Sequence, residues 1–168
     1  MKKNLFYYLF AVLCTVTLFT SCSDDDEPTV SMSEAVAGEY EGKLDVALVI
    51  GGASVSTGDP LTQSVSVTRA GDTMVDLRIT GFSFQGMNLG NIELENCQLT
   101  DAGNGAYRFT ATTELNLMNL LSGSVAATGE FTSNDELFLD LDIDEVVLGG
   151  NAVNYTVKVG YEGTKVAQ

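Results

Sequence analysis

Histidine and tryptophan are absent from this 168-residue chain, and proline occurs only twice. Without histidine, neither a Ser-His-Asp nor a Cys-His arrangement can form, and a zinc site would lack its imidazole ligands. No phosphate-cradling glycine motif leads from a strand into a helix. The 23 acidic residues guarantee accidental carboxylate pairs, so such pairs carry no information about catalysis. We therefore expect a protein that is not an enzyme and that holds no metal or cofactor.

Long apolar runs are also scarce, since the one sustained run extends only from Leu5 to Phe19. A helix needs about 20 apolar residues to cross a bilayer, and this run has about 15. Lys2 and Lys3 precede it, and small residues follow it before Cys22. A basic start, a short apolar centre and small residues predict a secretory signal peptide over residues 1–21.

Positive charge is the next shortage, with eight basic residues in the whole chain. Cleavage before Cys22 would leave 147 residues and remove Lys2 and Lys3, so the net charge of −15 would become −17. Such a chain repels phosphate backbones, which argues against nucleic-acid binding. Its length is typical of one domain with a real hydrophobic core.

Cysteine is too scarce to form a disulfide framework. Cys14 would leave with the signal peptide, which leaves Cys22 at the new N-terminus and Cys97 within the domain. Because Cys97 alternates with polar neighbours in a strand-like segment, we expect a small buried core residue. A reactive thiol is the alternative, although no histidine is present to lower its pKa.

The segment before Cys22, LFTSC, resembles the lipobox of bacterial lipoproteins, with Phe19 where that family usually has an aliphatic residue. The resemblance implies lipidation of Cys22, and two or more acyl chains make a stable membrane anchor. The residues that follow resemble the export signal of Bacteroidetes surface lipoproteins; they are Ser23, Asp24, Asp25, Asp26 and Glu27. Together they imply an outer-membrane lipoprotein that faces the cell exterior, with a periplasmic orientation as the alternative. We expect residues 22–37 to form an acidic tether.

From Gly38 onward the hydrophobic period is two, which predicts half-buried strands separated by glycine-rich turns. The predicted strands are 40–50, 61–68, 74–80, 91–100, 107–113, 125–132, 137–144 and 154–162. A change of phase near Asn96 predicts a β-bulge. We expect residues 82–90 to form an apolar loop, and residues 115–121 fit either a short helix or a strand.

About eight antiparallel strands predict an all-β domain over residues 38–165, either a single up-and-down barrel or a β-sandwich. Strands of nine or ten residues favour the barrel. GEYEGK near the start is similar to GYEGTK near the end, as expected if the first and last strands are neighbours.

The segments GEYEGKL, ITGFSFQGMNLGNIELEN and GYEGTK resemble the calycin-like β-barrel domains of Bacteroidetes lipoproteins. The resemblance covers residues 38–165 and implies an eight-stranded, lipocalin-like barrel. Tyr40 stands where lipocalins have the tryptophan of a Gly-x-Trp motif, so no lipocalin ligand is implied.

Three carboxylates, Asp140, Asp142 and Asp144, share one face of a predicted strand. On an extended strand they would lie about 6 to 7 Å apart, too far to surround one calcium ion without a turn. A solvated outer face is the favoured interpretation.

Apolar residues around the two irregular segments are the candidate ligand site, because small barrels bind guests at an apolar mouth. The candidates are Phe82, Phe84, Met87, Leu89, Leu115, Leu117, Met118, Leu120 and Leu121. The alternative is that they fill the barrel end as core. We expect a non-catalytic binding module for a small apolar or amphipathic ligand. The competing hypothesis is an interaction protein whose barrel exterior contacts a surface protein or a glycan.

Overall fold

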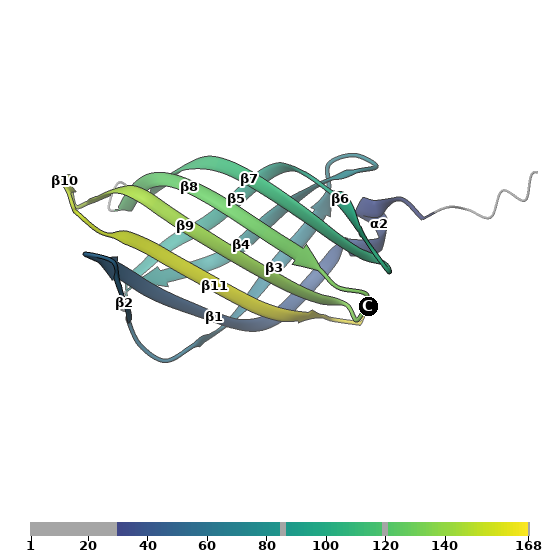
Figure 1. Cartoon of the computed structure of the whole chain (residues 1–168), viewed down its shortest axis with the longest axis horizontal. Helices are drawn as coiled ribbons and strands as arrows, with labels where there is room; N and C mark the ends of the chain where they lie inside the picture. Colours follow the sequence, from purple (N-terminus) through teal and green to yellow (C-terminus); the bar gives the residue numbers. More distant parts are fainter. Residues whose placement is uncertain (1–29, 85–86, 119–120, 168) are drawn as a thin grey trace, which may run out of the picture.

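The computed structural model describes residues 30–84, 87–118 and 121–167 of the chain. One antiparallel sheet curls around a single core, and a short helix lies at one end of it (Figure 1). The helix α2 covers Met32–Val36. The strands are β1 Gly38–Ile50, β2 Ala53–Ser56, β3 Leu61–Arg69, β4 Met74–Phe84, β5 Met87–Gln98, β6 Thr100–Gly103, β7 Ala106–Leu117, β8 Leu121–Phe131, β9 Glu136–Leu148, β10 Asn151–Ala152 and β11 Thr156–Lys165.

These eleven segments form eight continuous runs, as the sequence predicts. β2 and β3 pair with the same edge of β1 and are separated by a short loop. β5 and β6 follow one another with only Leu99 between them, and β10 and β11 both pair with β9. The expected up-and-down topology is therefore confirmed, and the sandwich alternative is wrong because one sheet supplies every wall.

The sheet closes because its ends meet. β1 pairs with β11 from Tyr40–Lys165 to Val49–Thr156, so the predicted neighbourhood of first and last strands is confirmed. At the other end of the strand order, β5 pairs with β4, and its continuation β6 pairs with β7.

Alternation of apolar and polar residues places one face of each strand in the core. Along β9, Leu137, Leu139, Leu141 and Ile143 are each at most 1% exposed, while the residues between them face outward. Each such side chain contributes about 1.5 to 3 kcal/mol through burial. Cys97 is buried in the same core, as predicted, and its pKa is raised to about 11 by burial and then by Asp76.

The predicted bulge near Asn96 is confirmed. Residues 95 and 96 together oppose Asp76 on β4, and the register shifts between the Val75 and Leu77 pairs. Asn96 has a φ of 54°, and its backbone N–H donates to the Asp76 carboxylate at 2.6 Å. The extra residue restores the inward direction of Cys97 after the change of phase.

Two local expectations need correction or completion. The apolar loop predicted for residues 82–90 is wrong, because β4 continues to Phe84 and β5 begins at Met87. The ambiguous segment at residues 115–121 joins two strands, since Leu117 ends β7 and Leu121 begins β8.

Part of the segment expected to form a tether, residues 22–37, is the helix α2, which packs onto the barrel. Residues 22–29 lie outside the described residues. Ser31 caps this single turn by accepting from the Glu34 N–H, and Val36 is buried. The Tyr40 hydroxyl donates to the Val36 carbonyl at 2.8 Å, and Lys165 donates to the Ala35 carbonyl at 2.9 Å. The helix therefore belongs to the domain and covers the barrel end nearest the N-terminus.

The predicted signal peptide, Cys22 and the Ser23–Glu27 acidic run lie outside the described residues. Within the described ranges, no helix has the length and apolar character needed to span a bilayer.

Candidate functional site

The predicted mouth residues that the structure describes lie at the barrel end opposite α2, which we call the distal end. Five of them are in the core: Phe82, Leu89 and Leu121 are fully buried, and Leu117 and Leu115 are 5% and 6% exposed. These side chains belong to the hydrophobic core.

The remaining mouth candidates line none of the cavities described here. Met118, in the turn after β7, is 66% exposed. Leu120 and the side chains of Phe84 and Met87 lie outside what the structure describes. The hollows described below are lined by other residues.

Residues 80–84 and 87–91, here called the distal hairpin, are attached to the barrel mainly by packing. The β3–β4 ladder extends only from Arg69–Val75 to Val65–Ile79, so the described residues of β4 beyond Ile79 have no ladder to β3. β5 packs beside β7, but their described residues form no ladder either.

Two glycines mark the base of the distal hairpin. Gly81 and Gly90 have φ angles of 69° and 105°, which side chains with a Cβ rarely adopt. The β4–β5 register shifts on either side of Phe82, which pairs with Gly90. The ladder of the distal hairpin is therefore irregular at its base, where Phe82 and Leu89 are fully buried.

The sequence analysis missed a second group of apolar residues at the distal end. Ile50, Val55 and Leu61 are 52%, 55% and 43% exposed. Leu61 pairs with buried Leu44, and Val55 pairs with Leu48, so both lie on the core side of the sheet. Core-side apolar residues that remain exposed indicate an incompletely filled distal end.

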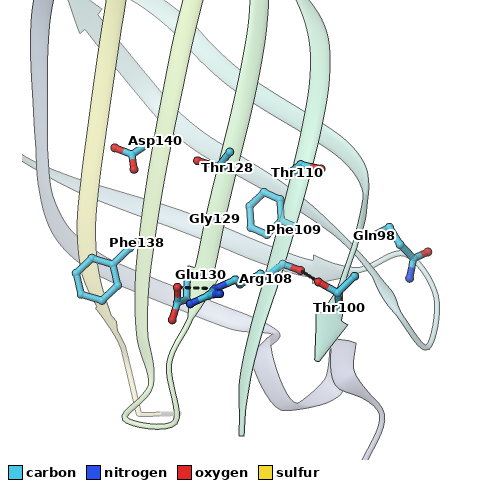
Figure 2. A pocket seen from close by; sticks show the side chains of 10 residues that line it. All are labelled: Gln98, Thr100, Arg108, Phe109, Thr110, Thr128, Gly129, Glu130, Phe138 and Asp140. Carbon is cyan, nitrogen blue, oxygen red and sulfur yellow. Dashed lines mark hydrogen bonds and ion pairs between the residues drawn. The ribbon is translucent and has the colours of Figure 1, made fainter. Parts of the chain in front are cut away.

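A hollow with a volume of about 510 Å³ lies on the outer wall of the barrel. Figure 2 shows its lining residues, which come from β5 to β9. They are Gln98, Thr100, Arg108, Phe109, Thr110, Thr128, Gly129, Glu130, Phe138 and Asp140. We call this the first hollow.

The strand register explains why these residues meet. Arg108 pairs with Glu130, and Glu130 pairs with Phe138, so one row crosses three strands. A second row joins Thr128 to its partner Asp140. Outward-facing residues in register lie about 4.5 to 5.5 Å apart, so each row presents contiguous side chains.

The first hollow has a polar rim and one aromatic wall. Arg108 Nε donates to Glu130 Oε2 at 2.8 Å, and this hydrogen bond and charge raise the pKa of Arg108. The Thr100 hydroxyl donates to the Arg108 carbonyl at 3.0 Å. Phe138 points outward and is 38% exposed, although a large apolar side chain gains by burial.

Beneath the first hollow, Phe109 packs over Gly129. A Cβ at Gly129 would overlap the Phe109 ring, so glycine makes room for it. Phe109 also contacts Phe131, with ring centroids 5.8 Å apart. This packed layer forms the floor of the hollow.

The acidic strand face is solvated, as expected. Asp142 accepts from Lys158 at 2.7 Å, and Asp144 accepts from the Thr156 hydroxyl at 2.6 Å. The described residues contain no group of three or more carboxylate or thiol side chains suited to a metal ion.

A signal for the outer-wall site was present in the sequence. Phe138 has the same parity as Asp140, Asp142 and Asp144, so strand alternation places all four outside. Phe138 is thus an aromatic residue on the polar face of an otherwise regular strand, and this is the sequence signal for the outer-wall site.

Comparison with known proteins identifies the fold. The family model of the calycin-like β-barrel domain matches residues 36–164. A crystal structure described as a "putative outer membrane protein" from Bacteroides fragilis NCTC 9343 is similar, with a TM-score of 0.59 and 21% identity. The similarity covers 82% of this chain and 54% of that one, so this chain spans about half of that protein's length. A search of curated proteins found no match.

Proposed function

We propose that this chain, which belongs to the calycin-like β-barrel domain family, is a lipid-anchored binding module. In this proposal it binds a neutral carbohydrate in the first hollow and catalyses no reaction. The proposal depends on one observation above all, the outward Phe138 ring in a hollow rimmed by hydroxyls and an ion pair. Sugars combine an apolar ring face with many hydroxyls, so an aromatic wall and polar groups suit them.

A protein partner fits this surface less well. Stable protein interfaces bury more than about 1,000 Å² around an apolar, aromatic-rich centre. Phe138 is the one large exposed apolar residue among those lining the first hollow. The backbone of β8 there is paired with β7 and β9, so a partner strand has no free edge to join.

The binding test uses the soluble form that begins at residue 28. Affinity electrophoresis in gels containing neutral polysaccharides (starch, xylan, mannan, dextran, cellulose ether) would identify the ligand. Calorimetry would then measure its affinity. We expect Phe138→Ala to weaken binding at least tenfold, about 1.4 kcal/mol, and Phe138→Tyr to retain it.

Met118→Ala is the matched control, because Met118 is exposed at the distal end, away from the hollow. Absence of retardation in every gel, or equal affinity of Phe138→Ala and the parent protein, would refute the proposal. Chromatography of the incubated glycan should show no shortened products, since we propose binding without hydrolysis.

We propose that Cys22 carries the anchor and that the acidic run directs the protein to the outer face of the outer membrane. The similarity to the Bacteroides fragilis structure supports the proposed compartment. Cys22→Ser should abolish incorporation of labelled palmitate in a Bacteroides host. Alanine at residues 24–27 should keep the lipid but protect the domain from protease added to intact cells. Unchanged surface digestion would contradict the export role.

A second candidate function is capture of a small apolar ligand at the distal end. The exposed core-side residues Ile50, Val55 and Leu61, together with the loosely attached distal hairpin, favour it. Native mass spectrometry of protein purified gently from its host would test this candidate. An additional mass that is lost on denaturation would support it, and a clean apo mass would favour the outer wall.

A further inference from the structure

A second hollow adjoins the first on the outer wall and has a volume of about 250 Å³. The two hollows share Phe138 and Asp140, so the Phe138 ring lies between them. Gly160 lines the second hollow, and its φ is not in the left-handed region. The nearest atom to a Cβ at Gly160 would be Asp140 Oδ1 at 3.8 Å. A side chain would therefore fit at this position without a clash, and its absence leaves the second hollow open.

The side chains on either side of Phe138 follow the same order. On one side, Phe138 of β9 pairs with Glu130 of β8, and Glu130 pairs with Arg108 of β7. On the other side, Phe138 pairs with Glu162 of β11, and Glu162 pairs with Lys43 of β1. The aromatic ring is thus flanked twice by a carboxylate and then by a cation, in the same row across the strands.

The row is also long. From Thr100 on β6 to Lys43 on β1 it crosses five interstrand steps. At about 4.8 Å a step, the row measures about 24 Å. A pyranose unit advances a sugar chain by about one such step, so the row matches an oligomer better than a single sugar.

We propose that the two hollows form one groove that binds a linear, neutral oligosaccharide across the strands, with the central sugar against Phe138. This inference rests on the proposed carbohydrate function. Repeated flanking groups suit a ligand with a repeating unit, because each flank offers the same acceptors and donors. The charge of −17 on the cleaved chain disfavours acidic glycans.

Chain length tests the inference. Calorimetry with oligomers of two to seven units, cut from the polysaccharide that binds most tightly, should show affinity rising up to about five units. Gly160→Leu fills the second hollow. We expect it to weaken binding of the five-unit oligomer at least tenfold and to weaken binding of the two-unit oligomer less.

Gly58→Leu is the matched control, because Gly58 lies in the loop between β2 and β3 and a Cβ there would meet no atom within 4 Å. Thermal unfolding confirms that each variant is folded. If affinity stops rising at two units, or if Gly160→Leu binds the longer oligomer normally, the inference is wrong while carbohydrate binding stands. If no oligomer or polysaccharide binds, the proposed function and the inference fail together.

Discussion

At the scale of the residue, we expect substitution by alanine to lower the stability of the fold at Gly129 but not at Gly160. Gly129→Ala would drive a methyl group into the Phe109 ring, which is itself packed on Phe131. Overpacking of this kind costs about 1 to 3 kcal/mol. Gly160→Ala meets no close atom, so we expect a change within about 0.5 kcal/mol.

Urea unfolding of both variants measures this difference. Adding Phe109→Leu to Gly129→Ala should recover part of the lost stability, because the smaller side chain frees the space. Equal stabilities of the two alanine variants would contradict the close packing of Phe109 on Gly129.

Two buried tyrosines predict a loss of stability at high pH. Burial, followed by the charges of Glu41 and Glu39, raises the pKa of Tyr161 to about 12, and burial raises the pKa of Tyr40 further. The folded state therefore keeps these protons at pH values where the unfolded chain, with a tyrosine pKa of about 10, releases them. This contribution is complete below about pH 10 and is lost as the pH rises towards 12.

Urea unfolding at pH 9, 10, 11 and 12, with absorbance at 295 nm to follow ionisation, tests the prediction. Tyr161→Phe also removes the 2.9 Å hydrogen bond to the Tyr40 carbonyl, so we expect a loss of about 1 kcal/mol at pH 8. Its stability should then fall less steeply above pH 10. A parallel fall in variant and parent would contradict the role of Tyr161. Tyr155→Phe, at a half-buried tyrosine, is the control.

At the scale of the element, the distal hairpin should open more readily than the rest of the sheet. Its described residues have no ladder to β3 or β7, and its base contains Gly81 and Gly90. Segments with few backbone hydrogen bonds to their surroundings exchange amide hydrogens through local opening. We expect the amides of Phe82 and Leu89 to exchange at least tenfold faster than those of Val65 and Val67.

Hydrogen exchange by NMR measures these rates one residue at a time. Phe82 and Val65 are both fully buried, so burial alone predicts equal protection. Equal rates would mean that packing holds the distal hairpin as firmly as a ladder does.

The elements also show where sequence patterns suffice. Regular alternation identified the eight runs, and a single change of phase located the bulge at Asn96. Residues 82–90 were mistaken for a loop because the bends at Gly81 and Gly90 shift the register and destroy the period of two. α2 was missed because five residues are too few to display a helical period.

The candidate site was harder to predict than the fold. Apolar side chains near irregular segments indicated a mouth, but the sequence does not tell whether such residues line a cavity or fill it. The proposed outer-wall groove depends on which residues of six different strands share a row, and this register follows from the turns and bulges. Only Phe138 carried a local signal, through its parity on β9.

At the scale of the whole molecule, the last strand is needed to close the barrel. Removal of residues 156–168 would leave unpaired edges on β1 and β9 and remove the buried side chains Val157, Val159 and Tyr161. We expect this truncation to abolish cooperative unfolding, observed by circular dichroism. Removal of residues 167–168 is the control and should leave the midpoint within about 2 °C. A cooperative transition in the longer truncation would contradict the closure.

The pairing of β1 with β11 also determines when the barrel can close during synthesis. Tyr40 pairs with Lys165, so the barrel cannot close until synthesis has passed the end of β11. Pairing between residues so distant in sequence is slow, because the intervening loop must first be ordered. The growing chain therefore stays open until β11 has been made, and a chain that is still open suits the proposed export in an unfolded state.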